Sequence, residues 1–340
     1  MREAFGAEFD VPDGYLNTAS IGIPPAAAGA AVAEAITAWR TGAGRAGEYD
    51  EPVARARQGF ADLVGVDVAR VAIGPAVSAL VGLVATALPP GARVLVAAGE
   101  FTSVTWPFAA QAERGVEVTE VELAEVGRRA GEFDLVAVSV VQSADGRVVD
   151  LDALRAARAG GTRVLLDATQ SLGWLDADVS WADAVVAAGY KWLLSPRGVA
   201  WMAIRPELSA VPAAAGWYAS ADRWTDVYGL PMTLAPDARA LDTSPAWYCH
   251  VGAAAALPWL AGLDRAAVHA HCVGLADAFR AGLGMAPGGS AIVSVPRPDA
   301  ARRLAEAGVV SATRAGAARV SFHLYNTEAD VERALAALRA

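Results

Sequence analysis

The chain has 340 residues, is 54% hydrophobic and carries a formal net charge of −9. It can bury a large core, and its acidity argues against a nucleic-acid or anionic-membrane surface, which needs clustered positive charge. Two cysteines, Cys249 and Cys272, and four histidines show no spacing typical of a zinc site or a disulfide framework. We therefore expect no metal, and we expect a small molecule and a second copy of the chain as partners.

The N-terminal segment MREAFGAEFDVPDGY carries charges where a secretory signal has an apolar run. The most apolar later stretch, VGAAAALPWLAGL, is too short to span a bilayer. These features predict a cytoplasmic protein that does not bind a membrane.

Short apolar segments alternate with alanine-rich helical patterns along the chain, and they predict seven strands. The strand candidates are residues 70–74, 93–98, 116–121, 134–141, 162–167, 183–188 and 199–204. Helical patterns such as SALVGLVATAL and LDALRAARAG lie between them. Nearly continuous apolar strands that alternate with helices predict an α/β fold with a mainly parallel sheet covered on both faces. A ligand binds such a sheet beyond the carboxyl ends of its strands.

Polar residues follow three of these strands. Ser78 lies in the turn after the first strand, where a helix begins, and the free amides of a helix N-terminus suit a phosphate. Asp167 ends the fifth strand candidate, and its alternative role is a helix cap. Lys191 follows the sixth, so Asp167 and Lys191 are expected at the same sheet edge.

Lys191 is the single lysine of the chain, and every other basic side chain is an arginine. A coding bias toward arginine explains the missing lysines but not the one that is kept, because arginine would serve equally well on a surface. A lysine amine, unlike a guanidinium group, can lose a proton and attack a carbonyl. The alternative is the chance survival of a surface lysine.

The segment of residues 216–248 is rich in aromatic residues and lacks a strong periodicity. A loop of this length is usually functional or disordered, and its aromatics argue against disorder. Two interpretations stay open, a wall of the substrate entrance and a dimer interface.

An amine, an acid and a phosphate site at one sheet edge together point to one kind of cofactor. Pyridoxal phosphate needs an amine to hold its aldehyde, an acid to keep its ring nitrogen protonated, and a cradle for its phosphate. Lys191, Asp167 and the turn of Ser78 offer these three groups. No G-x-G-x-x-G follows the first strand, which argues against a dinucleotide-dependent oxidoreductase.

Five segments carry a family resemblance: YLNTASIGIPP, LLDATQSLGW, AAGYKWLLSPRG, LDTSPAW and RVSFHLYNTEADVERALAAL. In this order, over almost the whole chain, they resemble the class V aminotransferase family of pyridoxal-phosphate enzymes. The branch suggested holds cysteine desulfurases, isopenicillin N epimerase-like proteins, kynureninases and C–S lyases. The resemblance implies the type I fold of pyridoxal-phosphate-dependent transferases, with a large domain of residues 21–262 and a smaller α+β domain of residues 1–20 and 263–340.

The resemblance also implies roles for individual residues. Lys191 would be the Schiff-base lysine, Asp167 the partner of the pyridine nitrogen, and Tyr190 a catalytic neighbour whose role is open. The cofactor would further meet Val77 and Ser78 at its phosphate, Phe101 stacked on its ring, Gln170 and Ser143 near its phenolic oxygen, and Thr243 with Ser244 from a second subunit. Phe101 has an equally good alternative as a core aromatic. A homodimer follows from the role of Thr243 and Ser244.

For the substrate, the resemblance points to Arg319 as the residue that binds the α-carboxylate, together with Asn17. A guanidinium group is a planar, two-pronged donor that fits a carboxylate. The alternative for Arg319 is an exposed strand arginine without a partner, and Arg314 and Arg197 are lesser candidates. Thr327 and Asp330 form a capping-box pattern that predicts the start of the last helix.

The departures from the family pattern bear on the reaction. Desulfurases carry a cysteine on a segment shortly before the final arginine strand, and residues 291–319 contain none. Cys249 and Cys272 lie in helical patterns, where small buried residues are expected. We therefore expect an enzyme that acts on a small α-amino acid or its S-conjugate by β-elimination. The alternatives are an aminotransferase, then an amino-acid epimerase, and last a non-catalytic relative.

Overall fold

A central seven-stranded sheet organises the computed structural model, which describes residues 1–339. The strand order is β3-β9-β8-β7-β6-β4-β5. The strands are β3 (Val71–Gly74), β4 (Arg93–Ala97), β5 (Glu117–Val121), β6 (Leu135–Ser139), β7 (Arg163–Asp167), β8 (Ala184–Ala188) and β9 (Ala200–Ile204). All seven predicted strands are confirmed. The sheet is mainly parallel, and only β9 runs antiparallel to its neighbours β3 and β8.

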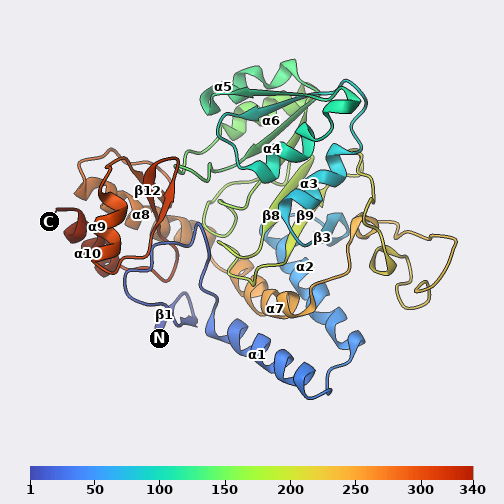
Figure 1. Cartoon of the computed structure of the whole chain (residues 1–340), viewed down its shortest axis with the longest axis horizontal. Coiled ribbons are helices and arrows are strands. Elements are labelled where there is room, and N and C mark those ends of the chain that lie inside the picture. The colour runs from blue at the N-terminus through green and yellow to red at the C-terminus, as the bar shows by residue number, and fades with distance from the viewer. Residues whose placement is uncertain (340) are drawn as a thin grey trace.

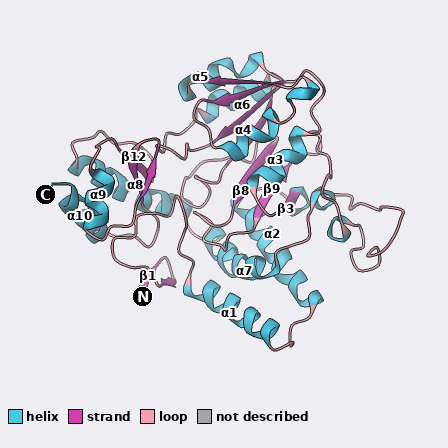
Figure 2. Ribbon diagram, viewed as in Figure 1, coloured by secondary structure: helices cyan, strands magenta, loops and turns pink. Residues whose placement is uncertain are grey.

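Helices cover both faces of this sheet, as Figures 1 and 2 show. The helices of this part are α1 (Ala26–Arg40), α2 (Asp50–Val64), α3 (Val77–Ala85), α4 (Thr102–Ala109), α5 (Leu123–Arg129), α6 (Leu151–Ala159) and α7 (Trp247–Ala261). One core joins the sheet to α3 and α4, and a second core joins its opposite face to α2, α5, α6 and α7. Leu95 and Val96, adjacent in β4, belong to different cores because side chains alternate across a strand.

A smaller sheet and three helices form a separate layer near the C-terminus, coloured orange to red in Figure 1. The antiparallel strand order is β10-β12-β11. The elements are β10 (Ile292–Val295), β11 (Ala312–Arg314), β12 (Ala317–Ser321), α8 (Arg265–Gly282), α9 (Ala300–Glu306) and α10 (Glu328–Arg339). They enclose a third core that also takes in Leu16. The division near residues 20 and 262 stays a prediction, since the core of the central sheet also takes in Phe9, Val268 and Tyr325.

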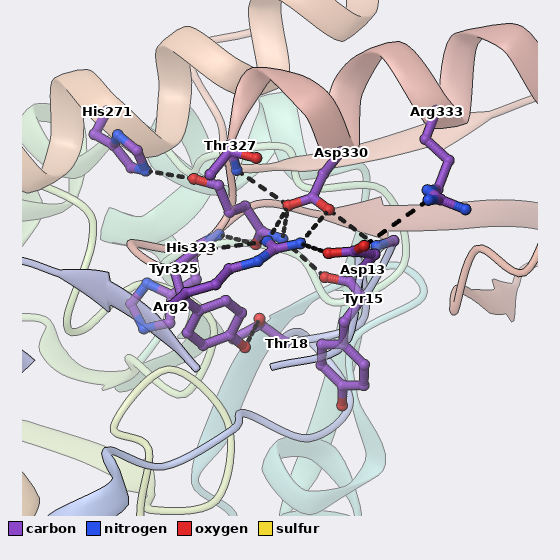
Figure 3. A network of polar contacts seen from close by, with 12 residues as sticks. Arg2, Asp13, Tyr15, Thr18, His271, His323, Tyr325, Thr327, Asp330 and Arg333 are labelled. Carbon is purple, nitrogen blue, oxygen red and sulfur yellow. Dashed lines mark hydrogen bonds and ion pairs between the residues drawn. The ribbon is translucent and has the colours of Figure 1, made fainter. Parts of the chain in front are cut away.

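The N-terminal segment is tied to helix α10 by a polar network (Figure 3). It begins with a small hairpin of β1 (Arg2–Ala4) and β2 (Ala7–Phe9). Arg2 Nη1 lies 2.6 Å from Asp330 Oδ2, and Arg2 Nη2 lies 2.7 Å from Asp13 Oδ1. Asp330 Oδ2 also accepts a hydrogen bond of 3.1 Å from the amide of Thr327. The last helix therefore begins where the capping pattern predicts, with Asp330 closing its first turn.

The aromatic segment of residues 216–248 extends from the body of the molecule in Figure 1. Two short 3-10 helices, Trp217–Ala219 and Ala238–Leu241, bound its outer part. Tyr228 and Leu230 are 95% and 90% exposed. Within residues 1–339, no helix combines the length and the apolar character needed to cross a membrane.

Candidate active site

The carboxyl ends of five strands build one cavity of about 340 Å³. Turns after β3, β4, β6, β7 and β8 supply its walls because these strands point the same way in the sheet. The lining residues are Pro75, Ala76, Val77, Ser78, Phe101, Thr102, Ser103, Ser139, Ser143, Asp167, Thr169, Gln170, Ala188, Tyr190, Lys191 and Arg197. The structure thus brings together eight of the predicted residues, and it leaves Asn17, Thr243, Ser244 and Arg319 outside this lining.

Lys191 is held in a turn after β8 and is only 6% exposed. The backbone carbonyl of Tyr190 accepts a hydrogen bond of 2.9 Å from the amide of Gly22. A Cβ atom on Gly22 would lie 2.0 Å from the carbonyl oxygen of Lys191, so the N-terminal segment can approach this turn only as glycine. Burial lowers the pKa of Lys191 to about 8, although the charge of Asp167 opposes this effect. The neutral, nucleophilic form of the amine is therefore far more populated near physiological pH than that of an ordinary lysine.

Asp167 ends β7 and faces the same cavity. Its Oδ1 accepts a hydrogen bond of 2.8 Å from the amide of Thr169, whose Oγ1 accepts a hydrogen bond of 3.0 Å from the amide of Ala188. Thr169 therefore fixes the carboxylate and ties the end of β7 to the end of β8. Burial raises the pKa of Asp167, while hydrogen bonds from Thr169 and the charge of Lys191 act in the opposite direction.

Gln170 and Ser143 form the wall next to Asp167. Gln170 Nε2 donates to Ser143 Oγ at 3.1 Å and to the carbonyl oxygen of Ala19 at 3.0 Å. Trp192 Nε1 donates to Gln170 Oε1 at 2.7 Å, which fixes the orientation of the amide. Because its amide is fully engaged, Gln170 is an ordered wall rather than a mobile side chain.

Phe101 closes another side of the cavity and is 45% exposed. Lys191 Nζ lies 5.2 Å from the centre of its ring. The ring is not part of the core, which removes the alternative interpretation of Phe101. It is placed to cover a flat group bound next to the lysine.

Arg319 lies behind the cavity wall in the middle of β12, two residues after the strand begins. It is 1% exposed, donates to Ser143 from Nη1 and to Ser20 Oγ from Nη2 at 2.8 Å, and its Nε is buried without a partner. Asn17 Oδ1 is likewise buried without a partner. A substrate carboxylate would reach Arg319 by taking the place of these serine contacts.

Val77 and Ser78, which also line the cavity, begin helix α3. Thr243 and Ser244 lie beside this turn in a separate small cleft with Pro75 and Gly198. A buried ion pair positions their loop: Arg57 Nη2 lies 2.6 Å from Asp242 Oδ2.

Glu100 and Ser139 form a buried pair that sequence reasoning missed. Glu100 Oε1 accepts from Ser139 Oγ at 2.6 Å and from the amide of Phe101 at 2.8 Å. Burial raises the pKa of Glu100, opposed by hydrogen bonds from Ser139. Glu100 precedes Phe101 after a buried strand, and this position is the signal that could have pointed to it.

The two thiols lie away from the cavity lining. Cys249 Sγ donates to the carbonyl oxygen of Arg197 at 3.2 Å, and Cys272 is fully buried in α8. Burial raises the pKa of both thiols. Among residues 1–339, no group of histidine, cysteine, aspartate and glutamate side chains could hold a metal ion.

The donor set of the cavity fits pyridoxal phosphate. A buried amine faces a buried carboxylate, an exposed aromatic ring stands next to the amine, and a helix N-terminus with a serine hydroxyl lies at one end. These are the groups that its aldehyde, ring nitrogen, ring face and phosphate require.

Comparisons with known proteins agree with this geometry. The family model described as aminotransferase class-V matches residues 37–307. The chain is 28% identical over 306 residues to the uncharacterized aminotransferase YcbU of Bacillus subtilis (strain 168), which covers 82% of this chain and 81% of that protein. It is 32% identical over 171 residues to isopenicillin N epimerase of Streptomyces clavuligerus, covering 45% of this chain and 43% of the epimerase. This second match spans less than half of either protein.

Among solved structures, the cystine C–S lyase C-DES, in complex with its reaction product cysteine persulfide, superposes with a TM-score of 0.84. The two sequences are 21% identical, and the match covers 96% of this chain and 97% of that chain. The likeness establishes the type I fold predicted from the sequence.

Proposed function

The chain belongs to the class V aminotransferase family of pyridoxal-phosphate enzymes, and from this we propose that it acts on a small α-amino acid or its S-conjugate by β-elimination. The observation that carries the proposal is a single cavity that holds one buried lysine and no thiol within the described residues. A desulfurase needs a cysteine that attacks the substrate sulfur, and neither Cys249 nor Cys272 lines this cavity. An elimination needs only a group that moves protons.

Lys191 is that group in our proposal. When bound, pyridoxal phosphate draws electrons from the α-carbon of an amino acid into its ring. The Lys191 amine would hold the aldehyde of the cofactor at rest and, once released, would be free to take the proton from the α-carbon of the substrate. A pKa of about 8 suits both the uptake and the return of a proton near neutral pH.

Asp167 and Arg319 have the remaining roles in the proposed reaction. Asp167 keeps a proton on the pyridine nitrogen, since an anionic carboxylate favours a cation at close range. Arg319 binds the α-carboxylate and orients the substrate, with Asn17 next to it. In the net reaction the Cα–H, Cβ–S and Cα–N bonds break, one water supplies the keto oxygen, and a thiol, ammonia and a 2-keto acid leave.

We also propose that the enzyme is a homodimer. Thr243 and Ser244 lie outside the cavity of their own chain but next to the turn that begins α3. The resemblance of the LDTSPAW segment to the family implies that these two residues reach the phosphate of a partner subunit, and the dimer proposal rests on it. The exposed segment of residues 216–248 is then available as part of the dimer interface, and a wall of the substrate entrance is the other interpretation.

The experiment is a panel of amino acids with a thiol or thioether leaving group at the β-carbon, assayed with and without pyruvate or 2-oxoglutarate. We expect ammonia and a 2-keto acid without an added acceptor. Product formation only with an acceptor would replace the lyase by an aminotransferase, which the likeness to YcbU favours as the second candidate. In deuterated water, inversion with deuterium at the α-carbon would indicate an epimerase, in line with the 32% identical relative.

A further inference from the structure

Arg197 is a cation of the cavity to which the proposed reaction gives no role. Its side chain lines the cavity and is exposed, and its guanidinium carbon lies 5.3 Å from the centre of the Tyr190 ring. Within residues 1–339, Arg197 forms no ion pair with a carboxylate. An arginine on an aromatic face, without a counterion and inside a cavity, is oriented and available for an anion.

The backbone that carries Arg197 is held firmly. Cys249 Sγ donates to the carbonyl oxygen of Arg197 at 3.2 Å, and Pro196 packs against Gly252 of helix α7. Gly198 has a φ of 124°, and a Cβ atom there would lie 3.0 Å from Cys249 Sγ. The guanidinium position is therefore set by a fixed backbone and by the ring of Tyr190.

The position of Arg197 in the cavity indicates which anion it binds. Gly198, the next residue, lines the small cleft that also contains Gly74 and Pro75. Pro75 belongs to the turn that begins helix α3, where Val77 and Ser78 line the cavity. Arg197 thus lies at the end of the cavity that fits a phosphate.

The charges in the cavity lead to the same conclusion. Lys191 and Arg197 are the two basic residues in the lining. The amine of Lys191 would be bound to the aldehyde of the cofactor. Arg319 and Arg314 both donate to Ser20 Oγ and do not line the cavity. A phosphate with two negative charges would therefore lack a cation from this chain unless Arg197 supplies it.

We propose that Arg197 binds the phosphate of pyridoxal phosphate and that Tyr190 is a positioning residue, whose ring face holds the guanidinium group in place. This inference depends on the cofactor and not on the type of reaction. Lys191 Nζ lies 5.6 Å from the centre of the same ring, so Tyr190 is near both the cation for the phosphate and the amine for the aldehyde.

The test compares two cofactors that differ only in the phosphate. Cofactor-free protein is titrated with pyridoxal 5′-phosphate and with pyridoxal, and binding is followed by visible absorbance and tryptophan fluorescence. We expect Arg197→Gln to weaken pyridoxal 5′-phosphate binding by roughly tenfold or more, as for the loss of a hydrogen bond to a charged group, and to leave pyridoxal binding unchanged. Arg197→Lys should recover part of the loss because it restores the charge without the two-pronged geometry.

Tyr190 variants test the positioning role. Tyr190→Phe keeps the ring face and should bind pyridoxal 5′-phosphate like the parent, while Tyr190→Leu should approach the affinity of Arg197→Gln. The matched control is Arg155→Gln, because Arg155 also stacks on an aromatic ring, at 5.4 Å from that of Trp181, but lies outside the cavity. This variant should leave both affinities unchanged.

Any of three outcomes overturns the inference. Equal losses for both cofactors, or no loss for either, would show that Arg197 does not bind the phosphate. Unchanged cofactor affinity with a raised KM for substrates that carry a second acidic group would assign Arg197 to the substrate instead. Cofactor affinity is measured without turnover. The result for Arg197 can therefore be interpreted even if the substrate panel shows no elimination.

Discussion

Lys191 and Asp167 share one cavity, and burial acts on each in the direction of its neutral form. The pKa of the amine falls to about 8 and the pKa of the carboxyl group rises, while each charge favours the other. The pair therefore combines a reactive amine with a carboxylate whose nearby cation is this lysine. A cofactor with a protonated ring nitrogen would supply Asp167 with a second cation.

The lowered pKa of Lys191 predicts how fast cofactor-free protein captures an aldehyde at different pH values. The neutral amine is the reactive form, so the rate should rise with a midpoint near pH 8 rather than near 10.5, the ordinary value. Stopped-flow absorbance after mixing with pyridoxal 5′-phosphate measures it. Because the α-amino group is the other amine of the chain, Lys191→Ala is the necessary control and should show no comparable phase.

Asp167→Asn tests the role of the carboxylate. The amide oxygen of asparagine can still accept the 2.8 Å hydrogen bond from Thr169, so the turn and cofactor binding should be kept. Turnover should fall roughly a hundredfold, because the pyridine nitrogen loses the charge that keeps it protonated. The measurements are kcat and the cofactor dissociation constant; a kcat equal to that of the parent would reduce Asp167 to a turn-capping residue.

At the level of elements, the site depends on a contact between the N-terminal segment and the turn after β8. Gly22 donates its amide to the carbonyl oxygen of Tyr190, and its Cα faces the backbone of Lys191. Ala19, three residues earlier, accepts from Gln170. A segment far from Lys191 in sequence thus helps to shape the cavity around it.

Gly22→Ala should disturb this contact. The added Cβ atom would lie 2.0 Å from the carbonyl oxygen of Lys191, so one of the two backbones must move, at a cost of roughly 2 kcal/mol in the free energy of unfolding. Cofactor binding should weaken as well. The matched control is Gly29→Ala in helix α1, where a Cβ atom meets nothing within 4 Å and alanine should stabilise slightly. Equal unfolding midpoints for the two variants in urea would contradict the importance of this contact.

The strands and the ligand edge could be predicted from the sequence because the strands from β3 to β9, apart from β5, are short, nearly continuous apolar runs. The chemistry of Asp167 and Lys191 was accessible for the same reason, since Asp167 ends such a run and Lys191 follows one. Glu100 and the Arg57–Asp242 pair were not accessible in this way, and the sequence pointed to Arg197 only as a lesser candidate for the substrate carboxylate. Arg57 and Asp242 are 185 residues apart, and only the folded chain shows that their charges pair inside the core.

On the scale of the whole molecule, the two ends of the chain stabilise each other. Asp330 accepts hydrogen bonds from Arg2, from the amide of Gly14 at 2.9 Å and from Asn326 Nδ2 at 3.2 Å (Figure 3). Burial raises the pKa of Asp330, but these hydrogen bonds outweigh burial and hold the pKa below its ordinary value. The ionised carboxylate therefore fastens the N-terminal segment, which continues to Gly22, onto helix α10.

Asp330→Asn should lower the free energy of unfolding by roughly 2 to 3 kcal/mol, the cost of losing a hydrogen-bonded buried charge. Since the folded pKa is depressed, the contribution is complete above the unfolded pKa of about 3.9 and is lost as the pH falls through the folded value. Urea unfolding at pH 7 and near pH 3 should show a difference between parent and variant that shrinks in acid. Glu306→Gln, in an exposed pair with Arg302, is the control and should change stability by less than about 1 kcal/mol.

The most direct measurement of the central claim is the intact mass of the protein after borohydride reduction in the presence of pyridoxal 5′-phosphate. Lys191 is the single lysine, so the account predicts one phosphopyridoxyl group per chain, located on the peptide that contains Lys191, and none in Lys191→Ala. The parent should be yellow before reduction and colourless after it. A Lys191→Ala protein that still takes up one group per chain, or a parent that takes up none, would contradict the assignment of this cavity.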